Sequence, residues 1–153
     1  AFSELKKYDD AFEYYLRAID INPDYAKTYL CYGIALSETK REDEAIEQYR
    51  KAISLDPYDS KMYVILANAL VEKKLYNDAV EYYKKAINLD KKNVMAYIAL
   101  GNTLTFMDKI EDALGYYREA RRLDPNNDEI HLIYAEAIEE YISKTDRINK
   151  TGG

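Results

Sequence analysis

Several residue types that carry chemistry are scarce in this chain of 153 residues, which has one cysteine, one histidine and no tryptophan. The lone cysteine, Cys31, excludes an internal disulfide framework and is typical of a reducing compartment. The lone histidine, His131, excludes a histidine-rich metal site. The five glycines lie inside helical patterns or at the C-terminal end, so no glycine-rich loop can cradle a phosphate. The sequence therefore predicts no metal, no cofactor and no enzymatic activity.

Positive charge and long apolar runs are also in short supply. The net charge is -6 and no basic stripe is visible. This disfavours nucleic acid as a partner, because such binding depends on Lys and Arg at the phosphates. No stretch has the pattern of a signal peptide or a membrane span. We expect a cytoplasmic chain that contacts neither nucleic acids nor membranes.

What the chain does contain is a repeat of 34 residues. An alanine, a tyrosine and a second alanine recur at i, i+4 and i+7, which places all three on one stripe of an α-helix. The four sets are Ala11, Tyr15, Ala18; Ala45, Tyr49, Ala52; Ala79, Tyr83, Ala86; and Ala113, Tyr117, Ala120. This period predicts a tandem array of one structural unit.

Besides the Ala-Tyr-Ala helix, each unit contains another helical pattern, which begins shortly after a proline or its replacement, Lys91. Proline stops the preceding helix because it has no amide hydrogen to donate. This other pattern, which is the first helix of each unit, carries a small residue at one position: Gly33, Ala67, Gly101 or Ala135. A glycine inside an exposed helix costs roughly 1 kcal/mol relative to alanine, so we interpret this position as a tight crossing with a neighbouring helix. The candidate N-caps of the Ala-Tyr-Ala helices are Asp9, Asp43 and Asn77.

A helical hairpin of this length and pattern resembles the tetratricopeptide repeat, and the resemblance covers residues 1 to about 141. The chain departs from the family pattern at four kinds of position: Tyr29, Tyr63 and Tyr97 where Trp is most frequent, Lys91 for proline, and Glu42 and Arg121 in apolar columns. These departures affect local packing. The resemblance implies an all-α fold, a right-handed superhelix of stacked antiparallel helix hairpins.

The repeat positions divide the chain into units. We expect a single array over residues 1–143 with a frayed tail over 144–153. The array comprises a partial repeat (1–25), three complete repeats (26–59, 60–93 and 94–127) and a C-terminal capping helix (128–143). In the partial repeat, residues 2–6 read as the end of a first helix and residues 9–21 as a second one. Such an entry in mid-repeat is typical of an excised fragment.

The resemblance also implies a function, because stacked hairpins present the first helix of every unit on a concave side that binds partners. We therefore expect a non-catalytic interaction module, a scaffold or adaptor that binds a protein or peptide. The positions that line such a groove are occupied here by Lys27, Leu30, Ile34, Lys61, Val64, Ile65, Asn68, Met95, Ile98 and Asn102.

Asn68 and Asn102 are the sharpest candidates in this groove. A carboxamide offers a donor and an acceptor, so it can pair with the backbone of an extended peptide whatever the peptide's sequence. The alternative is that both asparagines only cap local backbone or meet water. Apolar residues at neighbouring groove positions, such as Val64 and Ile98, favour binding, because solvated groove positions would otherwise be mostly polar.

Charge is graded along the predicted groove, with Lys27 and Lys61 toward its start and Glu129, Glu136, Glu139 and Glu140 on the last helix. An extended or helical peptide with a basic end over the last helix would fit this gradient. The alternative is that the glutamates are only the solvated face of a cap. The lysines and arginine of the carboxylate clamp that holds chaperone tails are absent, since those positions hold residues such as Leu30, Ile65 and Met95.

Two further functions stay open from the sequence. The first is a self-associating scaffold, a homodimer through an array end whose face carries Phe12, Tyr15 and Ile19. The second is a regulatory arm of a larger enzyme. His131 occupies the repeat position of Tyr29, Tyr63 and Tyr97, and Cys31 occupies a groove position, so neither is expected to be catalytic.

Overall fold

The computed structural model describes the backbone of residues 2–151 and the side chains of residues 8–147. Over this range the chain forms eight α-helices and no strand, which confirms the predicted all-α fold. The helices are α1 (Phe2–Ile21), α2 (Ala26–Glu38), α3 (Glu42–Leu55), α4 (Ser60–Glu72), α5 (Tyr76–Leu89), α6 (Val94–Phe106), α7 (Ile110–Leu123) and α8 (Asp128–Thr151).

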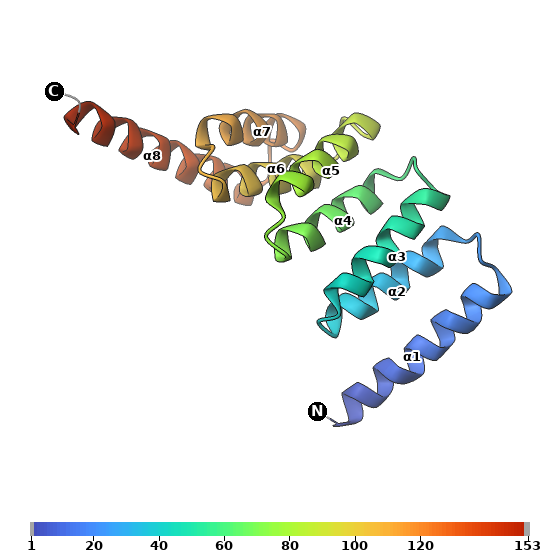
Figure 1. Ribbon diagram of the computed structural model, residues 1–153. Helices are drawn as coiled ribbons and strands as arrows, with labels where there is room; N and C mark the ends of the chain where they lie inside the picture. The colour runs from blue at the N-terminus through green and yellow to red at the C-terminus, as the bar shows by residue number, and fades with distance from the viewer. Residues whose placement is uncertain (1, 152–153) are drawn as a thin grey trace.

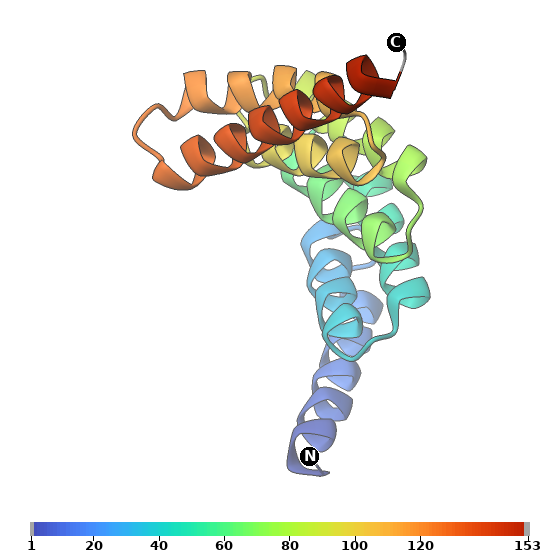
Figure 2. The same ribbon diagram turned by 90° about the vertical axis from the view of Figure 1, so that its left-hand side faces the viewer.

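Successive helices run antiparallel and lie side by side from α1 at one end of the array to α8 at the other (Figure 1). The pairs α2 and α3, α4 and α5, and α6 and α7 form the three complete hairpins. The view turned by 90° shows that the stack bends, with α1 extending from one end and α8 lying across the other (Figure 2). None of the described helices has both the length and the apolar character needed to cross a bilayer.

The Ala-Tyr-Ala stripes form the centre of each hairpin. The alanines of α3, α5 and α7 are fully inaccessible to solvent, and the tyrosines between them, Tyr49, Tyr83 and Tyr117, are 2 to 3% exposed. A tyrosine at this depth contributes a large apolar area to the core. Residues of all three hairpins and of α8 join in one continuous hydrophobic cluster. The core is therefore a seam that runs along the array.

The tight helix crossing predicted from the small-residue column is present in two hairpins. A Cβ added to Gly33 would lie 2.5 Å from Cε1 of Tyr49, and one added to Gly101 would lie 2.4 Å from Cε1 of Tyr117. No side chain fits at such distances without movement of the ring. The two glycines therefore let the core tyrosines lie directly against the backbone of α2 and α6.

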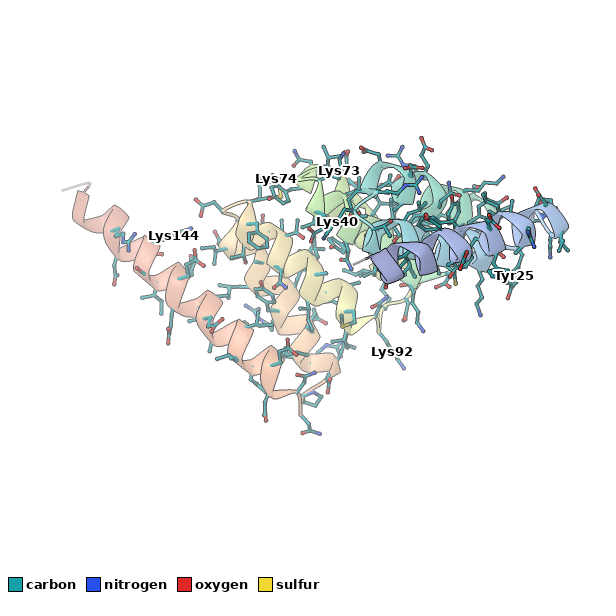
Figure 3. The ribbon with its side chains drawn as sticks, turned by 90° about the horizontal axis from the view of Figure 1, so that it is seen from below. Tyr25, Lys40, Lys73, Lys74, Lys92 and Lys144 are labelled. Atoms are coloured by element: carbon teal, nitrogen blue, oxygen red, sulfur yellow. The ribbon has the colours of Figure 1, made fainter. Side chains whose placement is uncertain are left out.

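The turns inside the hairpins are closed by residues with left-handed backbone conformation. Lys40, Lys74 and Asp108 have φ values of 64°, 59° and 62°. The amide of Arg41 donates to the carbonyl of Leu36 at 2.9 Å and that of Lys40 to Ser37 at 2.9 Å, a Schellman pattern. Figure 3 shows Lys40 and Lys74 at one edge of the array and Tyr25 and Lys92, in the turns between hairpins, at the opposite edge.

The predicted N-caps are wrong. α3 begins after Arg41 and α5 after Leu75, neither with a side-chain cap, because the Schellman turn leads directly into the second helix. Side-chain caps lie instead before the first helices α4 and α6. Asp59 accepts from the amide of Lys61 at 2.9 Å, and Asn93 accepts from the amide of Ala96 at 3.1 Å.

Both terminal helices are longer than the sequence predicts. The two helices expected in residues 1–25 are one continuous helix, α1. At the other end, α8 continues to Thr151 through most of the segment predicted as a frayed tail, whose last two residues lie outside the described range. Lys144 in this extension forms ion pairs with Asp108 and, at 3.3 Å, with Glu140, which ties α8 to the turn between α6 and α7.

The residues that depart from the repeat pattern are accommodated by contacts with nearby side chains. The guanidinium of Arg121, in an otherwise aliphatic column, lies 4.4 Å from the ring centroid of Tyr134. Glu42, in another apolar column, accepts a hydrogen bond from the hydroxyl of Ser37 at 3.0 Å. On the face of α1 considered above for self-association, Phe12 and Tyr15 both contact Tyr32 of α2.

Candidate functional site

Two hollows follow one another along the first helices of the hairpins. The larger, which we call the α4–α6 hollow, has a volume of about 500 Å³. Its lining comes from α4, the turn after α5 and the start of α6: Lys61, Val64, Ile65, Asn68, Asp90, Lys92, Asn93, Val94 and Met95. Most of the surface of this lining is apolar, and Met95 is 66% exposed. It is an apolar depression with polar groups at its rim.

The second depression, the α6–α8 hollow, has a volume of about 280 Å³. It is lined by Asn102, Thr105, Phe106, Tyr117, Ile133, Glu136, Ala137 and Glu140. Asn102 lies 34 positions after Asn68, so each hollow holds one asparagine at the same repeat position. Shifted by one repeat, the two linings have this asparagine in common and otherwise consist of different repeat positions.

The ten predicted groove residues fall into three groups. Five of them line the α4–α6 hollow, namely Lys61, Val64, Ile65, Asn68 and Met95. Asn102 lines the α6–α8 hollow. The remaining four, Lys27, Leu30 and Ile34 on α2 and Ile98 on α6, line neither. Leu30 and Ile98 are half-buried and pack against the core, whereas Lys27 and Ile34 are exposed.

Each groove asparagine is held by the core tyrosine of its own hairpin. The hydroxyl of Tyr83 donates to Oδ1 of Asn68 at 2.6 Å, and that of Tyr117 donates to Oδ1 of Asn102 at 2.8 Å. Each tyrosine lies 15 residues after its asparagine, on the second helix of the hairpin. With the carbonyl oxygen engaged, the exposed part of each carboxamide offers its two N–H donors.

The tyrosine hydroxyls remain protonated donors at neutral pH. Burial raises the pKa of Tyr83 to about 12, and a weaker opposing effect comes from the hydrogen bond of Thr103. Burial likewise raises the pKa of Tyr117, where the hydrogen bond of Thr105 lowers it and the charge of Glu140 raises it further. Both asparagines therefore accept from a neutral phenol across the physiological range.

The first hairpin lacks this pair. Ile34 occupies the position of the asparagines, and the hydroxyl of the equivalent Tyr49 interacts with Ser37 instead. Burial, reinforced by the charge of Glu42, raises the pKa of Tyr49 to about 12. The polar feature of the groove is thus confined to the second and third hairpins.

The rim of the α4–α6 hollow is fixed by a buried hydroxyl. Ser60, 8% exposed, donates to the carbonyl of Ala86 at 3.0 Å and accepts from Nδ2 of Asn93 at 2.7 Å. Asn93 in turn caps α6. These bonds hold the turn that carries Asp90 and Lys92 against the start of α4. Sequence reasoning missed these turn residues, because the groove positions of the resemblance lie on first helices only.

His131 and Cys31, considered above as possible reactive residues, line neither hollow. His131 is exposed, and its Nε2 lies 2.8 Å from the carbonyl of Pro125, as the hydroxyls of Tyr29 and Tyr63 lie 2.9 and 3.1 Å from those of Pro23 and Pro57. Cys31 is exposed. No cluster of three or more His, Cys, Asp or Glu side chains that could hold a metal occurs among the described residues.

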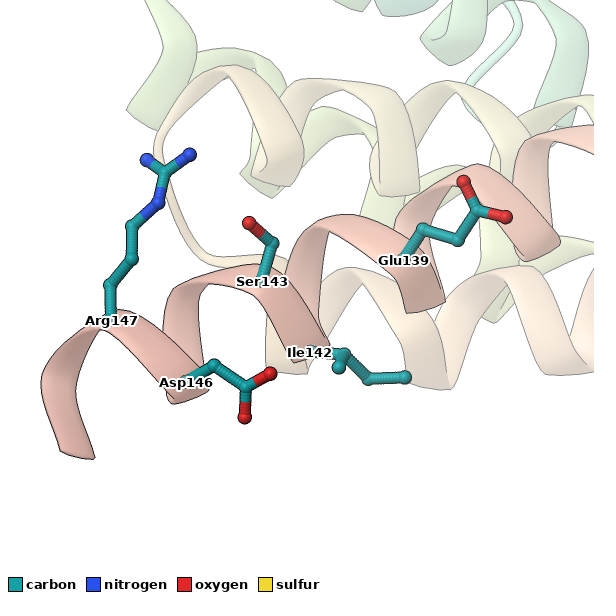
Figure 4. Close-up of a pocket in the computed structure, with 5 residues that line it drawn as sticks. All are labelled: Glu139, Ile142, Ser143, Asp146 and Arg147. Carbon is teal, nitrogen blue, oxygen red and sulfur yellow. The ribbon is translucent and has the colours of Figure 1, made fainter. Parts of the chain in front are cut away.

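A further depression on α8 is not a candidate site. Its five lining side chains, Glu139, Ile142, Ser143, Asp146 and Arg147, all belong to one helix (Figure 4). A single helix presents only a convex surface, with no second element to enclose a ligand. Binding sites are concave and bury most of what they hold.

Comparisons with known proteins agree on one family. A model described as TPR repeat matches residues 67–105, and models described as tetratricopeptide repeat match residues 14–47 and residues 1–25 and 96–127. None of the curated proteins matches the chain. Among solved structures, 375 chains match, so the fold is widespread and does not by itself identify a function.

Three solved structures illustrate the likeness. MamA is 21% identical with a TM-score of 0.74, and the match covers 94% of each chain. The first TPR of Spaghetti (RPAP3), bound to the HSP90 peptide SRMEEVD, is 24% identical with a TM-score of 0.73, over 77% of this chain and 94% of that one. YrrB, described as a TPR protein with an unusual peptide-binding site, is 25% identical with a TM-score of 0.72, over 83% of this chain and 66% of that one.

Proposed function

Because the chain belongs to the tetratricopeptide repeat family, we propose that it is a binding module that holds an extended peptide segment of another protein along the α4–α6 and α6–α8 hollows. The binding itself involves no chemical step. Repeats of this family typically mediate protein and peptide binding. The described peptide-binding site of YrrB, at 25% identity, supports the same use of the fold.

The observation that carries the proposal is the pair of tyrosine-held asparagines. An asparagine on a solvated surface samples several rotamers, and ordering it costs free energy when a ligand binds. The hydrogen bonds from Tyr83 and Tyr117 reduce this cost because they fix Oδ1 of each asparagine before any ligand arrives. The Nδ2 donors are then available for the carbonyl oxygens of a peptide backbone.

An extended peptide fits these donors better than a helical one. In a helix, nearly all carbonyl oxygens already accept hydrogen bonds within the helix. In an extended segment they are free, and successive side chains point to opposite sides. One side of the peptide can then enter the apolar α4–α6 hollow while its carbonyl groups meet Asn68 and Asn102.

The proposal is tested by selecting binders from a random library of displayed 12-residue peptides with the wild-type chain. Individual selected peptides are then measured against the Asn68→Ala, Asn102→Ala double variant. We expect the double variant to lose about tenfold to a hundredfold in affinity, because two hydrogen bonds in the groove each contribute about 1 kcal/mol. Retention of full affinity by the double variant, or the absence of any selected peptide, would contradict the proposal.

A matched control separates the groove from a general effect on the fold. Asn88 on α5 is also exposed, and its Oδ1 also accepts one side-chain hydrogen bond, from Lys91 at 2.8 Å, but it lines neither hollow. The Asn88→Ala variant is expected to bind the selected peptides like the wild type. Thermal unfolding of all variants, followed by circular dichroism, verifies that the array is intact.

A further inference from the structure

The two hollows differ in charge. Lys61 and Lys92 line the α4–α6 hollow, and the carboxylate of Asp90 beside them accepts from the amide of Lys92 at 2.9 Å. The α6–α8 hollow is lined by Glu136 and Glu140 and by no basic side chain among the described residues. Over about one repeat the groove therefore changes from basic to acidic.

The charges at the two hollows are only partly neutralised within the protein. Among the described side chains, no ion pair involves Lys61, Lys92 or Glu136, while Glu140 is 3.3 Å from Lys144. Lys61, Lys92, Glu136 and Glu140 are all exposed, so they are available to a ligand. A complementary ligand would gain both affinity and orientation from them.

Apolar surface accompanies the charges. Val64 and Ile65 on α4 face Val94 and Met95 of α6 across the α4–α6 hollow, and Met95 is largely exposed. A hollow of about 500 Å³ with such a lining accommodates one large apolar side chain and excludes water from it. The anchor of the ligand is therefore apolar, and the charges lie beside it.

Resting on the proposed function, we infer that the preferred ligand is an extended peptide with an aliphatic or aromatic residue flanked by Asp or Glu, followed about four residues after the apolar residue by Lys or Arg. The apolar residue enters the α4–α6 hollow with its acidic neighbours beside Lys61 and Lys92. The basic residue lies over Glu136 and Glu140. Packed helices lie about 8–10 Å apart, and Glu136 lies seven repeat positions further along its helix than Lys61, or about 10 Å along the axis. The resulting separation of about 14 Å is spanned by about four residues of an extended chain.

The inference is tested with three fluorescein-labelled synthetic peptides, measured by fluorescence anisotropy at low salt. The first has the sequence Glu-Leu-Glu followed by two alanines and two lysines, the second exchanges glutamates and lysines, and the third has glutamine at every charged position. Each is made in both chain directions. We expect the first pattern to bind about tenfold more tightly than the third, and the second to bind most weakly.

Charge reversal in the protein should reverse the order. The variant that combines Lys61→Glu, Lys92→Glu, Glu136→Lys and Glu140→Lys keeps the net charge of -6 and is expected to prefer the second peptide over the first by about tenfold. Added salt should reduce both preferences, because the charges are exposed and therefore screened.

The control variant reverses three charges away from the hollows, those of two lysines and one glutamate. Lys40 and Lys74 lie at the edge of the array opposite to Lys92 (Figure 3), and Glu139 on α8 lines neither hollow. The combination of Lys40→Glu, Lys74→Glu and Glu139→Lys should leave the order of the three peptides unchanged. An equal effect of this variant would mean that the preference reflects the overall field of the molecule.

The outcomes separate this inference from the proposed function. If the three peptides bind equally, or if the charge-reversed variant keeps the wild-type order, the charge pattern is wrong. The same holds if none of the three binds. The proposed function nevertheless stands if peptides from the random library bind in a manner that depends on Asn68 and Asn102. The proposed function is refuted only if no library peptide binds in a manner that depends on Asn68 and Asn102.

The direction in which the peptide lies along the groove can be measured with a spin label on the native cysteine, Cys31. Cys31 is exposed and occupies the repeat position of Ile65 and Ile133, which line the two hollows. A spin label on Cys31 should broaden the NMR signals of the acidic end of the first peptide more than those of its basic end. Stronger broadening at the basic end would overturn the assignment of the two hollows.

Discussion

The three complete hairpins and the two terminal helices give one repeat position different conformations. In the hairpins this position is Lys40, Lys74 or Asp108, and each adopts a left-handed backbone that ends the first helix. In α1 and α8 the equivalent residues are Lys6 and Ile142, and both remain helical. None of the five is a glycine. The turn is therefore not encoded by the residue that makes it.

The difference shows that packing imposes the turn. A left-handed conformation costs a residue other than glycine about 1–2 kcal/mol. Within a hairpin this cost is offset by the burial of the second helix against the first. Within the described residues no first helix lies before α1 and no second helix follows α8, so the chain at this position stays in the helical conformation that costs least.

The largest test of this comparison removes the packing itself. Tyr49, Tyr83 and Tyr117 are almost fully buried between the two helices of their hairpins. Replacing any one by alanine is expected to cost about 3–5 kcal/mol in the free energy of unfolding, measured with denaturant. Amide exchange should then be fastest in the turn of the hairpin that carries the change. Equal protection of that turn in wild type and variant would contradict the role of packing.

A smaller effect is expected from crowding the helix crossing. Gly33→Ala and Gly101→Ala place a methyl group against the rings of Tyr49 and Tyr117, which should cost about 1–3 kcal/mol in stability. Gly115 in α7 provides the control, since a Cβ there meets no atom within 4 Å. Gly115→Ala should stabilise the array by about 1 kcal/mol because alanine is the better helix former. Opposite signs in thermal unfolding would support the close crossing, and equal signs would refute it.

The sequence predicts the hairpins well because their helices depend on a pattern repeated in neighbouring positions. The Ala-Tyr-Ala stripe and the small residue at Gly33 or Gly101 are sufficient to place both helices and their contact. The prediction fails at the ends and at the caps, where the conformation depends on whether another helix packs there. Asp43 is a good N-cap by type, yet the turn before α3 leaves it inside the helix.

The residues of the candidate site likewise divide into those that the repeat pattern predicts and those that it does not. Side chains on first helices, such as Asn68 and Met95, can be assigned from their repeat positions. Lys92 and Asn93 cannot, because they belong to a turn whose place at the rim is fixed by a bond between Asn93 and Ser60, 33 residues apart. The bond between Asn68 and Tyr83 was equally out of reach, since neither residue alone indicates the other as its partner.

A third test compares the hairpins with one another. Tyr83→Phe and Tyr117→Phe remove the hydroxyl that holds a groove asparagine, whereas Tyr49→Phe removes one that has no asparagine beside it. Each change should cost about 1 kcal/mol in stability. Only the first two should also weaken peptide binding, because they release Asn68 or Asn102. Equal binding by all three variants in an anisotropy titration would show that the tyrosines do not position the asparagines.

The smallest expected effect comes from changing the turn residue alone. The change in stability should have opposite signs in a hairpin and in a terminal helix. Glycine adopts a left-handed conformation without steric cost but loses more entropy on folding, so Lys74→Gly should stabilise the array by about 0.5 kcal/mol. Ile142→Gly places glycine inside a helix, at a position that is 53% exposed, and should destabilise α8 by a similar amount or slightly more. The two variants carry the same new residue at the same repeat position. Stabilisation by both, measured by thermal unfolding, would mean that Ile142 already occupies a turn in solution and that α8 ends there.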